Sequence, residues 1–203
     1  MKQFFAVFFF VSPLCGFAYA QAVPSTTSFA RQQVTIDAGG SFTRKVTDSG
    51  ITFDPTSAID GTVGYRFYIN RWLGVEGDYD LFRNSQKYIS STSTTRVPTN
   101  VGAATAAVVV NIPNPLTKRF TSFISAGASE MLFYPHDTPG IDRQLKNAIM
   151  IGGGVDFPVS RHIAIRVQDK SFLYKAPDFK VADLHTNKYV ETMIPSAGLV
   201  FSF

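Results

Sequence analysis

Cysteine and tryptophan are nearly absent from this sequence of 203 residues, with one of each. The cysteine, Cys15, follows Leu14, where a lipid-attachment site needs a small residue, so lipidation is the weaker alternative there. Beyond Cys15 the chain has no thiol for a disulfide, a nucleophile or a zinc site. The sequence also lacks a metal-ligand cluster and a glycine loop for phosphate, so no cofactor or metal is expected.

Charge and long apolar runs are scarce as well. The net charge is +4, and Lys and Arg are scattered without a basic run, which gives nucleic-acid binding no support. After the first 20 residues no segment is apolar enough for a transmembrane helix. Aromatic residues are abundant instead, with 19 Phe and 8 Tyr in a chain that is 45% hydrophobic. This composition excludes wholesale disorder and favours strands.

The N-terminus carries the pattern of a secretory signal peptide over residues 1–20. Lys2 supplies the positive charge, residues 4–11 form the apolar stretch, and Ala18 and Ala20 form the small-x-small cleavage site. The alternative is a membrane anchor, but the apolar run is too short to span a bilayer. Residues 21–32 are polar, and we interpret them as a flexible periplasmic lead-in.

Eight segments of the remaining chain alternate between apolar and polar residues with the period of a β-strand. In the second of them, Val63, Tyr65 and Phe67 share one face, while Thr62 and Arg66 share the other. The eight predicted strands cover residues 33–42, 59–69, 72–82, 101–112, 120–133, 146–157, 162–174 and 188–203.

The connections between these strands alternate between long and short. Short turns are expected near Asn70, Asn114 and Ser160, whereas the long connections, such as residues 43–57 and 83–100, are polar loops. This asymmetry is typical of a transmembrane barrel, which has short periplasmic turns and longer outer loops. An even number of strands also allows the first strand to pair with the last.

A soluble β-sandwich or lipocalin-like barrel is the alternative. It would have to enclose large residues such as Tyr65, Phe67 and Tyr79, although the interior of eight strands is only just filled by side chains. Facing these residues to lipid removes the difficulty. The sequence therefore predicts an all-β fold, an eight-stranded antiparallel up-and-down transmembrane β-barrel over residues 33–203.

Three stretches resemble the small outer-membrane barrels of the OmpA/OmpX-like superfamily. They are residues 61–67 (GTVGYRF) with 70–76 (NRWLGVE), residues 152–156 (GGGVD) with 163–166 (IAIR), and the terminal strand, which ends on an aromatic residue. The resemblance implies a place in the bacterial outer membrane, contact with its lipid, and recognition by the barrel-assembly machinery. The residues expected to carry that recognition, and to face lipid, are Leu199, Phe201 and Phe203.

Charged residues on the polar faces predict a cluster in the barrel lumen. Arg66 and Glu76 are equally distant from Arg71 in one turn, and Asp156 and Arg166 are equally distant from Arg161 in another. Each pair would therefore face across its hairpin. With Asp78, Lys170 and, as a further candidate, Glu130, they are expected to fill the lumen and fix strand register; two unrelated pairs at the rim are the alternative.

One residue departs from this pattern. Alternation places Asp169 toward lipid, so we expect either that it lies above the membrane edge or that a bulge shifts its strand.

The expected function is structural or interactive: a monomeric barrel with a filled lumen whose outer loops present a surface to an unknown extracellular ligand. A narrow channel or carrier for small solutes is the second possibility. A lipid-modifying enzyme is the weakest one. No spacing brings His136, His162 or His185 beside a serine such as Ser171 with an orienting carboxylate, so no catalytic residue is predicted.

Overall fold

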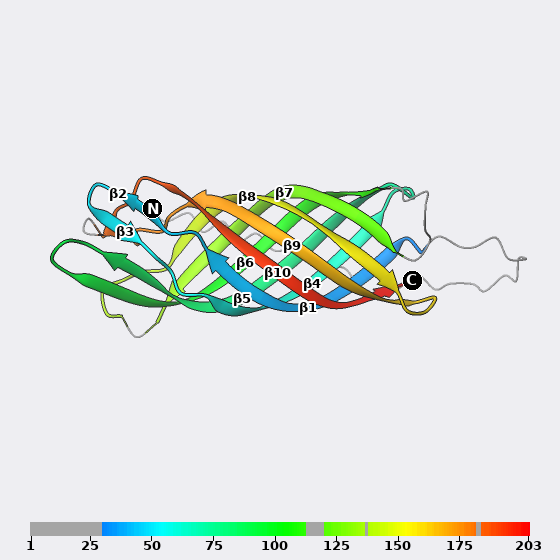
Figure 1. Cartoon of the computed structure of the whole chain (residues 1–203), viewed down its shortest axis with the longest axis horizontal. Helices are drawn as coiled ribbons and strands as arrows, with labels where there is room; N and C mark the ends of the chain where they lie inside the picture. Colours follow the sequence, from blue (N-terminus) through cyan, green and yellow to red (C-terminus); the bar gives the residue numbers. More distant parts are fainter. Residues whose placement is uncertain (1–29, 113–119, 137, 182–183) are drawn as a thin grey trace, which may run out of the picture.

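The computed structural model describes residues 30–112, 120–136, 138–181 and 184–203, and it folds into one antiparallel sheet (Figure 1). Within these residues no helix is long and apolar enough to cross a membrane. The strands are β1 (Gln32–Thr43), β2 (Val46–Asp48), β3 (Ile51–Phe53), β4 (Ala58–Tyr68), β5 (Leu73–Ile89), β6 (Thr94–Ile112), β7 (Thr121–Pro135), β8 (Gln144–Pro158), β9 (Ile163–Lys175) and β10 (Tyr189–Ser202).

Eight of these strands close into a barrel. β1 pairs with both β4 and β10, and the additional pairing of β5 with β6 completes the ring. Each strand is antiparallel to its neighbours, and the first strand of the barrel lies beside the last. The predicted eight-stranded up-and-down barrel is therefore confirmed. The short hairpin β2–β3 is attached to the end of β5 through Phe53 and Tyr88.

The two ends of the barrel differ. The turns at residues 69–72 and 159–162 lie at the same end as Phe203, which we call the short-turn end (Figure 1). The β2–β3 hairpin and the β5–β6 hairpin project from the opposite end, the long-loop end (Figure 1). The signal peptide, most of the lead-in and the turn near Asn114 lie outside the described residues.

The side chains alternate across the barrel wall as the period of two requires. Ile36, Val63 and Tyr65 are exposed on the outer wall, whereas Thr35, Thr62 and Arg66 are buried in the lumen. Leu199 and Phe203 are also exposed. Leu199 lies opposite Ile36, and Phe201 lies opposite Val34, at the seam between β10 and β1. A wall that is apolar on its outside suits a lipid surrounding.

The prediction of a long polar loop over residues 83–100 is wrong. β5 continues to Ile89, β6 begins at Thr94, and the ladder is continuous from Arg83 opposite Asn100 to Ile89 opposite Thr94. Asn84, Gln86 and Tyr88 still face the barrel axis and are buried. The outer face of this extension is polar, which hides the alternation that marks the membrane-facing strands. The predicted loop 43–57 likewise contains the β2–β3 hairpin.

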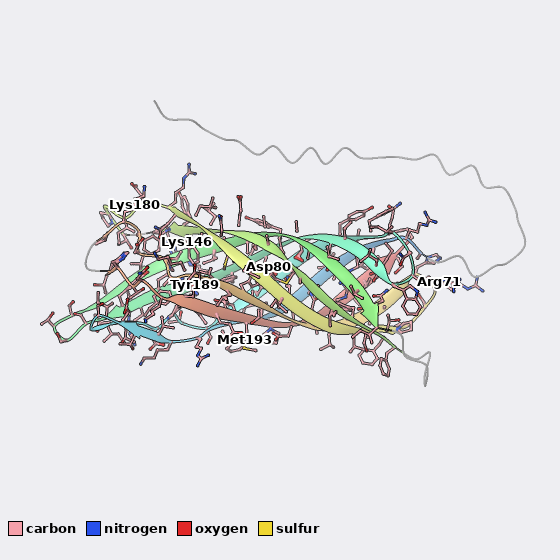
Figure 2. The ribbon with its side chains drawn as sticks, turned by 90° about the horizontal axis from the view of Figure 1, so that it is seen from above. Arg71, Asp80, Lys146, Lys180, Tyr189 and Met193 are labelled. Carbon is pink, nitrogen blue, oxygen red and sulfur yellow. The ribbon has the colours of Figure 1, made fainter. Side chains whose placement is uncertain are left out.

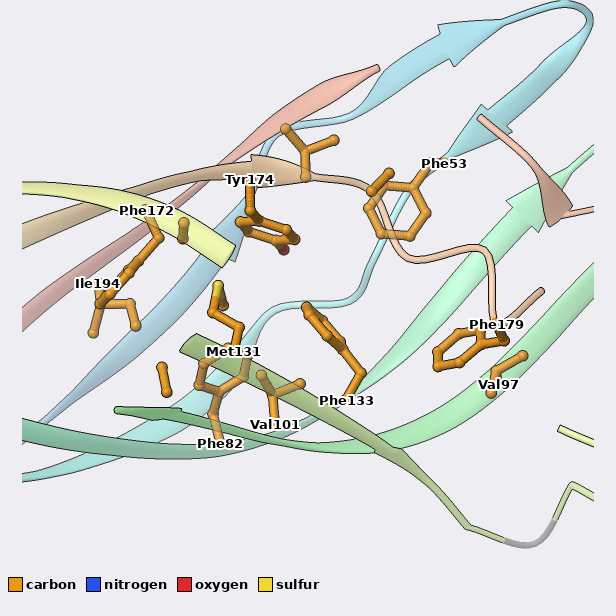
Figure 3. Packing of buried hydrophobic residues seen from close by; sticks show 14 of the residues in the cluster. Phe53, Phe82, Val97, Val101, Met131, Phe133, Phe172, Tyr174, Phe179 and Ile194 are labelled. Atoms are coloured by element: carbon orange, nitrogen blue, oxygen red, sulfur yellow. The ribbon is translucent and has the colours of Figure 1, made fainter. Parts of the chain in front are cut away.

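The lumen is filled by two different kinds of side chain. Toward the long-loop end, buried apolar residues of the barrel strands meet Phe53 of the β2–β3 hairpin and Phe179 of the last loop (Figure 3). Leu184 belongs to the same cluster. Ring pairs stabilise this cluster, with centroids 5.2 Å apart for Phe53 and Tyr88 and 5.6 Å apart for Phe133 and Tyr174. Toward the short-turn end, the lumen is polar and charged.

Candidate functional site in the barrel lumen

The first ion pair of the lumen joins β4 and β5. Arg66 lies directly opposite Glu76 in the ladder. Its Nη2 donates to both carboxylate oxygens, at 3.1 Å and 2.9 Å. The guanidinium is fully buried, so Glu76 supplies the charge that a buried cation requires. Arg66 also donates to Tyr68, whose hydroxyl donates to Asn111 on β6.

The second ion pair joins β8 and β9. Asp156 lies opposite Arg166, and the two form a bidentate pair with donor–acceptor distances of 2.7 Å and 2.8 Å. This fork geometry is the strong form of an arginine–carboxylate contact. Arg166 also donates to Thr35 at 3.1 Å and to Gln33 at 3.2 Å, both on β1. One buried side chain therefore links three strands of the wall, β1, β8 and β9.

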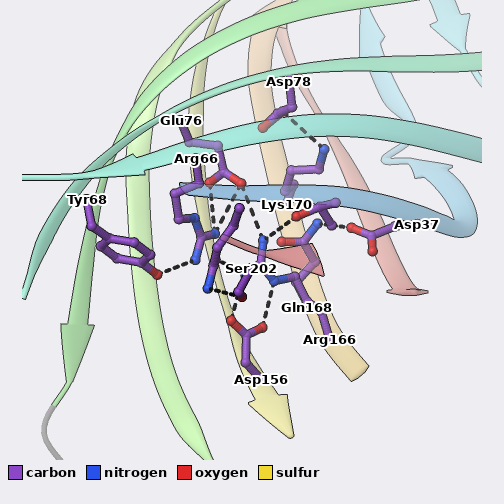
Figure 4. A network of polar contacts seen from close by, with 12 residues as sticks. Asp37, Arg66, Tyr68, Glu76, Asp78, Asp156, Arg166, Gln168, Lys170 and Ser202 are labelled. Atoms are coloured by element: carbon purple, nitrogen blue, oxygen red, sulfur yellow. Dashed lines mark hydrogen bonds and ion pairs between the residues drawn. The ribbon is translucent and has the colours of Figure 1, made fainter. Parts of the chain in front are cut away.

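The two pairs join into one network across the lumen (Figure 4). Nη1 of Arg166 lies 3.5 Å from Oε1 of Glu76. The ring of Phe123 faces both guanidinium groups, 4.2 Å from that of Arg66 and 4.7 Å from that of Arg166. Cations over an aromatic face are attracted by its quadrupole. A Cβ on Gly154 would lie 2.8 Å from this ring, so glycine provides the space for it.

Lys170 forms the centre of a second part of the network. Its ammonium group pairs with Asp80 and lies 3.5 Å from Asp78. The hydroxyl of Thr62 lies 2.6 Å from Asp80 and 3.0 Å from Asp60. A hydroxyl has one hydrogen and can donate it to only one of the two carboxyl groups. Asp80 is thus better satisfied than Asp60.

Negative charge exceeds positive charge in this set, which we call the lumen charge network. It contains six carboxyl groups and three cations: Asp37, Asp60, Glu76, Asp78, Asp80, Asp156, Arg66, Arg166 and Lys170. Asp37 accepts from Gln168 at 2.7 Å. One oxygen each of Asp37, Asp60, Asp78 and Asp80 is buried without a hydrogen-bond partner in the described part of the chain. Among the same residues, no group of acidic, histidine or cysteine side chains is arranged to hold a metal ion.

The lumen opens toward the short-turn end. A cavity of about 210 Å³ lies there, lined by residues that include Gln33, Tyr68, Asn111 and Asp156. It gives solvent access to the edge of the network.

Two charged residues do not join the network. Glu130 faces outward and is exposed, because its neighbour Met131 occupies the inward position on β7. Including it in the cluster is therefore wrong. Asp169 also faces outward. The explanation by a bulge is wrong, because the ladders of β9 run without one on both sides. Asp169 is the central residue of that strand.

The histidines and Ser171 have partners other than one another. Ser171 donates to Glu191 at 2.5 Å on the outer wall. His185 bonds Asp178 at 2.8 Å, and His162 lies 3.1 Å from the carbonyl oxygen of Ser202. His136 contacts Arg83. A serine nucleophile activated by histidine needs that histidine within hydrogen-bond reach, and none of these histidine contacts involves Ser171.

Asp178 ties the last loop to the rim of the barrel. It accepts from Gln144 at 2.7 Å and from His185, and its side chain also accepts from the backbone of Lys180. Burial opposes its ionisation, but these hydrogen bonds and the nearby Lys146 ammonium outweigh that cost and hold the pKa of Asp178 well below its usual range. Phe179 beside it adopts a positive φ of 48° and is buried.

Several members of the network were not singled out from the sequence. They are Asp37, Asp60, Asp80, Phe123 and Gln168. Parity already places each of them on the inward face of its strand. Their mutual contacts depend on the curvature of the closed wall, which the spacing of residues within one hairpin does not contain.

These features define a class of protein: a closed antiparallel barrel with an apolar outer wall and a charged lumen spans a membrane with its strands. Residues 8–203 match the family described as outer membrane protein beta-barrel domain. The chain belongs to this family and is a protein of the bacterial outer membrane. In such barrels the short turns lie on the periplasmic side, so the long-loop end is extracellular.

Solved structures with the same fold have little sequence identity with this chain. OprG from Pseudomonas aeruginosa is 12% identical, with a TM-score of 0.59, covering 88% of this chain and 99% of that one. Neisserial surface protein A is 14% identical, with a TM-score of 0.60, covering 85% and 97%. The N-terminal β-barrel domain of Pseudomonas aeruginosa OprF is 14% identical, with a TM-score of 0.50, covering 86% and 100%. A comparison with curated protein sequences gives no match.

Proposed function

We propose that this protein is a closed, monomeric barrel without enzymatic activity, whose long-loop end acts as an interaction surface. The observation that carries the proposal is the filling of the lumen. The charge network occupies one half, and the apolar cluster with Phe53, Phe179 and Leu184 occupies the other. An eight-stranded barrel has little interior space beyond its side chains.

The interaction surface is built on rigid elements. The β5–β6 hairpin continues its ladder from Arg83 to Ile89, and Tyr88 donates to the backbone oxygen of Pro177 at 2.6 Å, joining the hairpin to the last loop. Burial raises the pKa of the Tyr88 phenol, which therefore remains a neutral donor. Loops positioned by a rigid scaffold are common sites of binding. The partner proposed at the other end is the assembly machinery, through Leu199, Phe201 and Phe203.

Conductance in planar lipid bilayers tests the closed lumen. We expect the native protein to give no reproducible conductance steps. The double variant Phe82→Ser/Phe133→Ser removes two rings from the apolar half and serves as the positive control, because it should admit water and ions. Regular conductance steps of the native protein would overturn the proposal.

A narrow cation pathway is the second candidate function. The observation that favours it is the excess of carboxyl groups in the lumen charge network, four of which have one unpartnered buried oxygen: Asp37, Asp60, Asp78 and Asp80. If the native protein does conduct, this candidate requires a reversal potential that favours cations and that falls in the variant Asp37→Asn/Asp60→Asn.

A further inference from the structure

A groove of about 340 Å³ lies on the outer wall of the barrel near the long-loop end. Its lining includes three cations, Arg44, Lys45 and Lys188, with Leu173 and Tyr189 beside them. Arg44 follows β1 directly, and its backbone N–H donates to the carbonyl oxygen of Glu191 on β10 at 2.8 Å. The groove therefore lies over the seam between the first and last strands of the barrel. Its volume is at the small end of the range of ligand pockets.

The groove begins where the apolar wall ends. Phe42 and Met193 face each other in the ladder of β1 and β10, and each lies two residues below Arg44 and Glu191 respectively. Both side chains, like Leu173, are exposed on the outer wall. Met193 lies nearer the middle of the barrel and Tyr189 nearer the long-loop end (Figure 2). Tyrosine at such a boundary is typical of the membrane–water interface.

The cations of the groove are available to a ligand. Lys45 lies 3.9 Å from Asp54, and Lys188 lies 3.9 Å from Asp48, with the lysine side chains 58% and 54% exposed. Exposed pairs at this distance contribute little. Arg44 has no ion-pair partner among the residues that the structure describes. The carboxylate of Glu191 already accepts from Ser171.

We propose that this groove binds the phosphorylated sugar head group of an outer-leaflet lipid. Arg44, Lys45 and Lys188 would contact the phosphate, because lysine and arginine at a membrane surface attract anionic head groups. Glu191 would accept a hydrogen bond from a sugar hydroxyl. The acyl chains would lie on Leu173, Met193 and Phe42. This inference is independent of whether the lumen conducts.

The experiment uses the full chain with Cys15→Ser and Thr47→Cys, labelled with a fluorophore at the groove. The protein is reconstituted in phosphatidylcholine vesicles that contain increasing mole fractions of bisphosphorylated lipid A. We compare Arg44→Gln/Lys188→Gln with Lys87→Gln/Arg96→Gln, which removes the same charge from the β5–β6 hairpin, where these two residues lie opposite each other. Heat-modifiable gel mobility verifies that each variant is folded.

We expect a saturable fluorescence change whose midpoint moves about 25-fold higher in the groove variant, about fivefold for each cation removed, and stays in place in the hairpin variant. Equal midpoints for the two variants would overturn the proposal. Equal binding of dephosphorylated lipid A would assign the groove to acyl chains alone. The same fluorescence change with millimolar inorganic phosphate in phosphatidylcholine vesicles that lack lipid A would assign it to free phosphate. Either of these results also overturns the proposal.

Discussion

Arg166 and Glu76 approach to 3.5 Å across the lumen, although 90 residues separate them in the chain. The contact joins the β8–β9 hairpin to the β4–β5 hairpin, on opposite arcs of the barrel. Glu76 therefore accepts hydrogen bonds from two arginines, and it connects the two ion pairs of the lumen charge network.

The first prediction concerns this carboxylate. Glu76→Gln leaves Arg66 without its charged partner in a buried position, and we expect the free energy of unfolding to fall by about 3 kcal/mol. Urea unfolding in lipid vesicles measures the change. Asp142→Asn is the control, since Asp142 is exposed in a loop outside the barrel wall and its substitution should change the free energy by less than about 0.5 kcal/mol. Similar losses in both variants would contradict the dependence on Glu76.

The sequence predicts this network only in part, for a physical reason. Within a hairpin, equal distance from the turn places Arg66 opposite Glu76 and Asp156 opposite Arg166, and both registers are present. The contact from Arg166 to Glu76 depends on how the sheet curves and closes, which no local spacing encodes. The same limitation applies to Phe123 on β7, whose ring faces both guanidinium groups.

The mixed lumen is a second feature that the sequence does not reveal. Apolar residues on the inward parity, such as Phe82, Met131 and Phe172, pack against loop residues rather than lipid. Since both faces of a strand can be apolar for different reasons, alternation alone does not separate a lipid contact from a packed core.

A second prediction compares two carboxyl groups that share Thr62. Asp80 pairs with Lys170, so Asp80→Asn should lower the free energy of unfolding by about 3 kcal/mol. Asp60, like Asp80, has one unpartnered buried oxygen, but it has no cation partner in the described part of the chain, so Asp60→Asn removes no ion pair and should be neutral or stabilising. Both substitutions replace one carboxylate oxygen with an amide NH2 group, so each variant is the control of the other. A larger loss for Asp60→Asn would reverse our interpretation of the network.

A third prediction concerns the loop after β9. Asp178→Asn removes the charge that binds His185 and Lys146, so trypsin should cleave the folded variant after Lys180 severalfold faster than the native protein. Asp142→Asn, in another exposed loop, is the control.

Because the pKa of Asp178 is lowered by folding, its contribution is present at pH values above about 4 and is lost as the pH falls further. The native loop should therefore remain closed at pH 5, and opening between pH 7 and 5 would contradict this assignment.

The last prediction concerns Asp169, which lies halfway along β9 and faces outward. Its ladder partners are Gly153 and Pro195, which offer no side-chain hydrogen-bond donor. One of its carboxylate oxygens is buried without a partner among the described residues. A charged residue on the lipid face costs most at the centre of the bilayer, with a smaller cost for acidic than for basic side chains.

Asp169→Leu should therefore raise the free energy of unfolding in lipid vesicles by about 2 kcal/mol. Asp142→Leu, outside the barrel wall, should leave it unchanged. The gain should disappear in bilayers thin enough to bring this part of the wall to the lipid–water interface, because the carboxylate then remains hydrated. A loss of stability in Asp169→Leu would instead mean that Asp169 has a polar partner on the outer wall, since only a satisfied carboxylate stabilises the barrel at that depth.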